Sequence, residues 1–309
     1  MTLPPQSLFL VTVNASNTLY SVTYPTAVRH VVQIVLENRD AGSVLSNAPF
    51  EANLVSAFGY VPNYYAVCHP SLPNYLALTS GNPFECGYDD FVPESATNLG
   101  DLIGDAGLSW ADYNLATSDP GSDLCTDPLG YNSSVTSNVF APFLHYQDVL
   151  DNTSYCEAHM QSWEEWNATV ASGTLPSYSF LTLNKDQNGH SGGLAASDAW
   201  LEGFLSPLLN DSFAPSTAYF IEYDEAATTD TGFNGTVGGQ VYATVVGGAV
   251  LPHSTYTAPA TDYNTLATIE WLLDLGHTGY NDTGAYPPMK SLFAPSPAGF
   301  APPAHPYLA

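Results

Sequence analysis

Apolar and polar positions along this chain form two alternating patterns. After Arg29 the run HVVQIVL is almost continuously apolar and β-branched, as in a strand that is buried on both faces of a parallel sheet. Later runs of similar character are LSWADYN from Leu108, YSFLTL from Tyr178, AYFIEY up to Tyr223 and VYATVVGG from Val241. We interpret each of these runs as a strand.

Helix-like segments lie between these strands. Their predicted ranges are 72–80, which closes at Gly81, then 95–107, 157–170, 197–209 and 263–275, and residues 40–58 are expected to form a helix or an irregular cover. Because strands alternate with helices, the pattern predicts an α/β fold whose sheet has parallel character.

The chain divides into one main domain, at 27–294, and two ends. Residues 1–26 hold short β-like pieces and form an N-terminal extension, whereas residues 295–309 are Pro-rich and could be an extended strap or a stalk for cell-wall attachment. Within the main domain, residues 118–156 are rich in Asp, Asn, Ser, Gly and Pro, which predicts a loop-rich insertion. The sequence shows neither a signal region after Met1 nor an apolar run of transmembrane length, so we expect a mature segment.

The charge balance narrows the choice of partners. Charged residues make up 11% of the chain, and the net charge is -26 at pH 7. Such a surface repels nucleic-acid phosphates and anionic lipids, which excludes a nucleic-acid partner. Because most carboxylates are neutral below about pH 4 and only four basic residues exist, little self-repulsion would remain there. We interpret this as adaptation to an acidic exterior; an ordinary acidic secreted protein is the alternative.

The cysteines and glycosylation sequons also point outside the cytoplasm. Four cysteines fit two disulfides in any of three pairings, and no Cys/His spacing suggests zinc. Seven Asn-x-Ser/Thr sequons favour a glycosylated surface. The cysteines are Cys68, Cys86, Cys125 and Cys156, and the sequons are at Asn14, Asn132, Asn152, Asn167, Asn210, Asn234 and Asn281.

Ser71 stands at the start of a predicted helix. In CHPSLPNYLALTSG it is followed by Pro73 and an apolar run that ends at Gly81, so its hydroxyl lies in or before the first helical turn. Backbone N–H groups and the helix dipole favour an anion at such a position. Ser71 could therefore be a nucleophile, or it could be only a helix cap.

Polar side chains follow three of the predicted strands at the point where each strand ends. These are Glu37 and Asn38, the segment 184–190, and Asp224 with Glu225. In parallel α/β sheets such residues meet at the carboxyl edge. Each alone could simply end a strand, but acids at several buried strand ends need a compensating cation or hydrogen-bond network. Their oxygen atoms suit a hard divalent cation, with Ser71 facing it.

These segments carry a family resemblance that spans Arg29 to about Gly276. HVVQIVLENRD resembles the first strand, and HPSLPNYLALTSGN the nucleophile segment, of the phosphoesterase family that includes bacterial phospholipases C and secreted acid phosphatases, within the alkaline phosphatase superfamily. FLTLNKDQNGHSGG and FIEYDE look like its third and fourth motifs, and LATIEWLLDLG is similar to its C-terminal helix. The resemblance implies an alkaline-phosphatase-like sandwich with a central, mostly parallel sheet flanked by helices.

The resemblance also implies roles for individual residues. It implies that one divalent cation (Ca, Mg, Mn or Zn) is held by Glu37, Asn38, Asp224, Glu225 and Ser71, that Ser71 is the nucleophile, that Asn74 and His69 help to hold phosphate, and that His190 is an acid or phosphate ligand. Two departures, Asn188 in place of Asp and Asp262 in place of His, argue against a two-zinc arrangement.

Two of the basic residues lie beside the expected site. Arg39 and Lys185 adjoin its segments and could steady phosphate oxygens, or could simply be surface residues at strand ends.

The resulting hypothesis is a secreted, metal-dependent acid phosphatase that hydrolyses small phosphate monoesters through a phosphoserine, with His190 as the acid. The alternatives are a phosphodiesterase or phospholipase C with the same site, and a surface glycoprotein whose degenerate site only binds a ligand.

Overall fold

The structure is a computed structural model that describes residues 28–115, 124–129, 133–228 and 232–293, together with the backbone of two strands nearer the N-terminus. The predicted tail at 295–309 and parts of the predicted extension and insertion lie outside the described residues.

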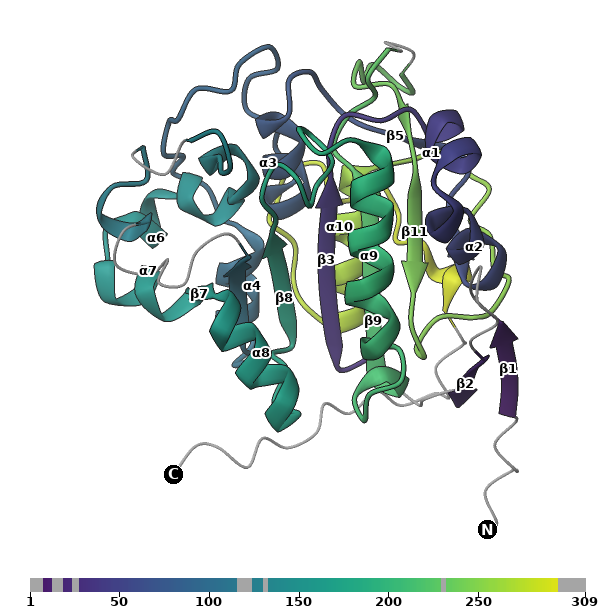
Figure 1. Ribbon diagram of the computed structural model, residues 1–309. Helices are drawn as coiled ribbons and strands as arrows, with labels where there is room; N and C mark the ends of the chain where they lie inside the picture. The colour runs from purple at the N-terminus through teal and green to yellow at the C-terminus, as the bar shows by residue number, and fades with distance from the viewer. Residues whose placement is uncertain are drawn as a thin grey trace.

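A seven-stranded sheet forms the centre of the molecule (Figure 1). Its strands are, in spatial order, β4 (Gly59–Tyr60), β11 (Ala243–Val246), β9 (Thr217–Tyr223), β3 (His30–Leu36), β8 (Tyr178–Thr182), β6 (Trp110–Asn114) and β7 (Met160–Ser162). β3 pairs in parallel with β9 and β8, and β6 in parallel with β8 and β7, whereas β11 and β4 run antiparallel at one edge. The prediction of a central, mostly parallel sheet is confirmed.

Helices cover both faces of this sheet. In Figure 1, α9 lies in front of β9 while α10 lies behind the sheet. α1 and α2 pack beside α9, and α3 and α4 pack beside α10. The helices and 3-10 turns are α1 (Ala41–Asn47), α2 (Pro49–Ala57), α3 (Leu72–Ser80), α4 (Leu99–Asp105), η1 (Asn138–Phe140), η2 (Pro142–His145), α6 (Gln147–Leu150), α7 (Thr153–His159), α8 (Trp163–Ser172), α9 (Leu194–Leu208), η3 (Ala214–Ser216), α10 (Asp262–Leu273) and η4 (Lys290–Leu292).

Two smaller sheets complete the fold. One is three-stranded, in the order β10 (Gln240–Val241), β5 (Tyr64–Tyr65) and β12 (Ala260–Thr261). The other is an antiparallel pair, β1 (Leu8–Thr12) and β2 (Leu19–Thr23), within the predicted β-like extension. The described part of 118–156 carries short helices as well as loops.

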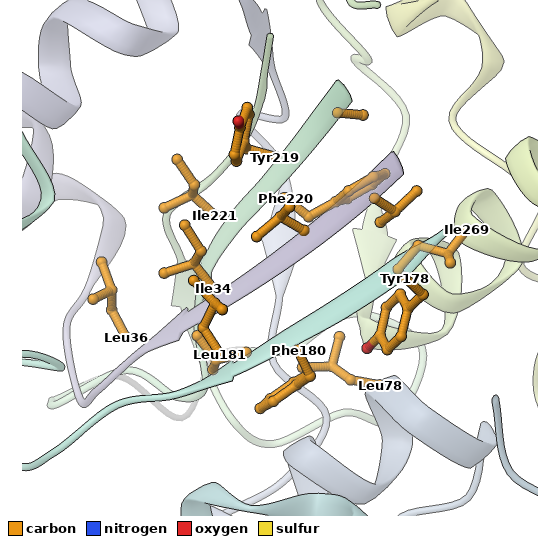
Figure 2. Packing of buried hydrophobic residues seen from close by; sticks show 14 of the residues in the cluster. Ile34, Leu36, Leu78, Tyr178, Phe180, Leu181, Tyr219, Phe220, Ile221 and Ile269 are labelled. Carbon is orange, nitrogen blue, oxygen red and sulfur yellow. The ribbon is translucent and has the colours of Figure 1, made fainter. Parts of the chain in front are cut away.

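The core lies on both faces of β3 and its neighbours (Figure 2). Ile34, Leu181 and Ile221 are in register and share one face. Phe180 and Phe220 occupy the next row and so point to the other face, where Leu78 of α3 and Ile269 of α10 contribute to the buried cluster. This packing fixes α3 and α10 against the sheet, which decides where the start of α3 lies.

The structure corrects two expectations. The predicted helix at 157–170 is interrupted by β7, because Ser162 caps a new helix together with Glu165 in a reciprocal capping box. The predicted strand from Val241 is split, since β10 and β11 belong to different sheets and β11 runs antiparallel to β9.

The two expected disulfides are both formed. Of the three possible pairings, the structure shows Cys68 with Cys86 and Cys125 with Cys156. In the described part of the chain, no helix has the length and apolar composition needed to cross a bilayer.

Candidate active site

Two parallel strands bring their terminal acids together. Leu36 and Tyr223 are in register as the last residues of β3 and β9, so Glu37 and Asp224 follow at the same edge of the sheet. The backbone continues the pairing there, because the Asp224 N–H donates to the Leu36 carbonyl at 2.9 Å. Both acids are fully buried. The expected meeting of these two residues is confirmed.

Asn38 links the two acids through an unusual backbone conformation. Its φ of 57° is in the left-handed region, which Asn adopts more readily than most residues. In this conformation its N–H donates to Asp224 Oδ1 at 2.9 Å, and its side-chain amide donates to Glu37 Oε2 at 2.6 Å. The turn therefore holds both carboxylates in place.

Ser71 precedes α3 but does not cap it. Its hydroxyl makes no capping bond and instead donates to Glu37 Oε2 at 3.2 Å. The carboxylate of Asp89 takes the capping position and accepts from the Leu72 N–H at 2.9 Å. The helix-cap interpretation of Ser71 is therefore wrong, and its hydroxyl faces the acidic cluster.

Tyr75 and Asp89 were not predicted as site residues. Tyr75 lies four residues after Ser71, on the same face of α3, and its hydroxyl donates to Glu37 Oε1 at 2.7 Å. The helical spacing from Ser71 could have indicated it. Asp89 reaches the helix start on a loop tethered by the Cys68–Cys86 disulfide, which no local sequence pattern reveals.

His69 and Asn74 lie beside the cluster in different roles. His69 Nδ1 lies 2.7 Å from Glu225 Oε2, which forms an ion pair when the imidazole is protonated. The fully buried Asn74 accepts from the Cys68 N–H at 2.8 Å and donates to the Cys68 carbonyl at 3.0 Å. Both polar ends of Asn74 are engaged with the backbone and fix the loop that leads to Ser71, and its contact with phosphate stays a prediction.

The loop after β8 brings positive groups to the same edge. The Arg39 guanidinium donates to the carbonyls of Asn38, at 2.7 Å, and Gly189, at 3.1 Å. Lys185 Nζ donates to the Ser133 carbonyl at 2.7 Å. The His190 side chain is exposed on one side, and the partial loss of solvent around its ring, followed by the charges of Lys185 and Arg39, lowers its pKa.

The cluster concentrates negative charge in a buried place. Burial, followed by the charge of Asp224, raises the pKa of Glu37 well above its usual value. Burial raises the pKa of Asp224 to about 6, and burial with the Asp224 charge raises that of Glu225 to about 9. Asp224 Oδ2 is buried, and no donor among the described residues forms a hydrogen bond to it. Buried carboxylates of this kind fit a divalent cation, since each needs a positive partner to remain charged.

The protein is therefore an α/β protein in which a cluster of carboxylates lies beside a serine at the start of a helix. The model of the Phosphoesterase family matches residues 43–233, a range that includes Ser71, His190, Asp224 and Glu225. The chain belongs to the Phosphoesterase family.

Curated relatives are known from fungi and bacteria. This chain is 30% identical to a "Probable acid phosphatase" of Kluyveromyces lactis over 72% of its own length and 53% of the relative. It is 29% identical to an acid phosphatase of Aspergillus niger, over 82% of this chain and 60% of the relative. It is 28% identical to a phosphatidylinositol-3-phosphatase of Mycobacterium tuberculosis, over 81% and 79%. The chain thus spans only 53% and 60% of the two fungal relatives.

Solved structures support the fold. A protein of the alkaline phosphatase superfamily from Vibrio parahaemolyticus matches with a TM-score of 0.55 at 14% identity, over 86% of this chain and 72% of the other. A phosphonate monoester hydrolase from Silicibacter pomeroyi matches with a TM-score of 0.51 at 9% identity, over 81% and 74%. The chain therefore shares the fold of these two structures.

Proposed function

We propose that this protein is a secreted, metal-dependent acid phosphatase that hydrolyses phosphate monoesters through a phosphoserine at Ser71. The observation that carries the proposal is the Ser71 hydroxyl, which does not cap α3 and lies 3.2 Å from the buried Glu37 carboxylate. The names of the fungal relatives support the reaction, and the two disulfides support secretion. The acidic working environment is inferred from the small number of basic residues.

A divalent cation would be held by Glu37, Asn38, Asp224 and Glu225, with the Ser71 hydroxyl beside it. When bound, it would offset the negative charge of the site and of the phosphate and favour the ionised serine. Ca, Mg, Mn and Zn all accept such oxygen ligands, and a carboxylate such as Glu225 has a second oxygen beside the Oε2 that is paired with His69.

The chain's own residues account for the proton and bond changes. Ser71 releases its proton to water and attacks phosphorus, so that an O–P bond forms to Ser71 as the bond to the leaving oxygen breaks. His190 donates a proton to that leaving oxygen. Water then attacks the phosphoserine, His190 takes a proton from it, and Ser71 leaves with its proton restored.

Positioning groups surround this centre. Tyr75 holds Glu37 from the opposite oxygen, and Asn74 fixes the backbone at Cys68, so the cluster and the nucleophile keep their relative places. His69 and the N–H groups of Arg39 that are not used on carbonyls would bind phosphate oxygens, with Lys185 further out.

A lipid-directed or diester reaction is the second candidate because a pocket adjoins the nucleophile helix. It has a volume of about 410 Å³ and is lined by Leu72, Pro73, Leu76, Pro83, Phe84, Glu85, Tyr88, Asp90, Val92 and Glu94. Such a pocket could take an apolar leaving group. Assays of p-nitrophenyl phosphate beside a lipid diester, at pH 3 and pH 7, separate the two reactions.

The decisive experiment measures turnover of p-nitrophenyl phosphate with and without a chelator. We expect turnover that is lost with the chelator and regained with a divalent cation. A protein that binds phosphate or a cation but never turns over would instead be the ligand-binding glycoprotein of the third hypothesis. Isolation of a phosphorylated Ser71 after an acid quench would establish the intermediate.

A further inference from the structure

A second cluster of possible metal ligands lies at the other end of α3. Glu270 comes from the last turn of α10, and His277 and Asp282 come from the loop that follows. This loop contacts the end of α3, because Thr278 Oγ1 donates to the Ser80 carbonyl at 2.5 Å and the Asn281 N–H donates to the Gly81 carbonyl at 3.1 Å. Along the helix axis the cluster is separated from Ser71 by about 13 Å, at about 1.5 Å per residue.

The three side chains converge closely. One ligand atom from each lies within 4.8 Å of the others. His277 Nδ1 is 2.8 Å from Glu270 Oε2 and 3.9 Å from Asp282 Oδ2. The carboxylates are 1% and 0% exposed, whereas the His277 side chain is 53% exposed, so one side of the cluster is open to water.

The two buried carboxyl groups of this cluster contact each other. Glu270 Oε1 and Asp282 Oδ1 are buried and accept no hydrogen bond from an N–H or O–H donor of the described residues, and burial together with the contact to Asp282 raises the pKa of Glu270 to about 10. Among those residues, His277 is the basic group that pairs with both acids. Two carboxylates in such a place require either a cation or a shared proton, because an uncompensated buried charge is costly.

We propose that Glu270, His277 and Asp282 form a zinc site, separate from the catalytic cluster. One imidazole nitrogen and two carboxylate oxygens are ordinary zinc ligands, and the open side at His277 leaves a fourth position for water. The imidazole makes zinc a better match than calcium or magnesium, which prefer oxygen ligands. The bound ion would clamp the 277–282 loop to α10 and to the end of α3, and the site therefore serves stability.

The test compares the whole chain with His277→Ala, a change to an exposed side chain that leaves both buried carboxyls in place. After equilibrium dialysis against Zn²⁺, we expect the wild type to retain one more zinc per chain than the variant. Zinc at about 100 times its Kd should raise the wild-type Tm by about 5 °C more than that of His277→Ala. His253→Ala is the matched control, because His253 is also exposed but its Nδ1 bonds to a backbone carbonyl instead of a carboxylate.

Two results would overturn the proposal. Equal zinc content and an equal Tm response in the wild type and His277→Ala would mean that the carboxyls share a proton instead. A site that takes Mn²⁺ but not Zn²⁺ would contradict the choice of metal. Co²⁺ substitution gives a further readout, since visible absorption typical of four-coordinate cobalt should appear in the wild type and in His253→Ala and be absent in His277→Ala. Asp282→Asn, if it folds, should behave like His277→Ala.

Discussion

The two ends of α3 carry two buried acidic clusters that differ in what they can do. At the start of the helix, Glu37 and Asp224 face a serine hydroxyl and an edge of the sheet that is supplied with positive groups. At its end, Glu270 and Asp282 face a histidine and one loop, whose Thr278 hydroxyl donates to Asp282 Oδ2 at 2.8 Å, and no serine hydroxyl among the described residues bonds to either acid. We propose a cation for both clusters, and the serine at the start of α3 distinguishes the one suited to catalysis.

The most severe test of this comparison is removal of the hydroxyl. Ser71→Ala should lower kcat by at least about 10⁴-fold, because loss of a nucleophile removes the covalent route. Ser80→Ala, at the other end of the same helix, is the control and should keep most activity. Steady-state rates with p-nitrophenyl phosphate check both. A folded Ser71→Ala protein with near wild-type turnover would contradict the mechanism.

Exchange of one acid at each end should separate the two clusters. Asp224→Asn should lower kcat by about 10³-fold and remove one bound cation, since a ligand of the catalytic cluster is weakened. Glu270→Gln should spare the rate at 25 °C and lower the zinc-dependent rise in Tm. Rate assays and metal analysis on the same samples decide this. If Glu270→Gln lost as much activity as Asp224→Asn, the division of roles would fail.

A third buried acid, Asp112, shows how a buried carboxyl outside the two clusters affects the pH dependence of stability. Asp112 of β6 accepts a bond from Thr182 at 2.7 Å, and burial raises its pKa to about 8. The folded state then binds a proton that the unfolded state releases near pH 4, so this contribution to stability is complete below pH 4 and falls until pH 8. The expected loss is about 2–3 kcal/mol between pH 5 and pH 7.

Urea unfolding at pH 5, 6 and 7 measures that loss. Asp112→Asn should show a shallower decline with rising pH than the wild type, because the amide does not ionise. Identical slopes in the two proteins would mean that Asp112 is charged in the folded state. Asp112 would then no longer serve as the protonated acid with which the two clusters are compared.

The smallest expected effect concerns the support of Glu37. Tyr75→Phe removes the hydrogen bond to Glu37 Oε1 and should lower kcat about 10-fold, which corresponds to about 1.4 kcal/mol. Tyr263→Phe, on the neighbouring α10, is a matched control that leaves the Glu37 bonds in place. An unchanged kcat in Tyr75→Phe would show that the other contacts of Glu37 suffice to hold it.

The sequence was informative where chemistry follows strand order. The run before Glu37 and the run before Asp224 are apolar and end in acids, and parallel pairing then requires these ends to meet. The sequence was uninformative where the contact depends on backbone paths. Asp89 accepts its bond from the Leu72 N–H because the Cys68–Cys86 disulfide closes the intervening segment, and Asn74 bonds to the Cys68 backbone, which no local pattern describes.

A short strand and a pair of residues distant in the sequence were not predicted, for related reasons. β7 has three residues, too few for a hydrophobic period to register, and its place is fixed by pairing with β6. Glu270 and Asp282 are twelve positions apart and meet only because the loop after α10 folds back on the end of α3. Tertiary packing, which a single sequence does not display, decides both.

The Cys68–Cys86 disulfide makes the active fraction of this protein depend on the redox conditions of its expression. The cross-link closes the segment that returns Asp89 to the first turn of α3, whereas β3 and β9 contain no cysteine and are paired without it. Protein in which Cys68 and Cys86 stay reduced while Cys125 and Cys156 are joined should therefore keep a near-native far-ultraviolet spectrum and contain few molecules with the proposed activity, so spectroscopic quality control alone would overestimate the usable yield.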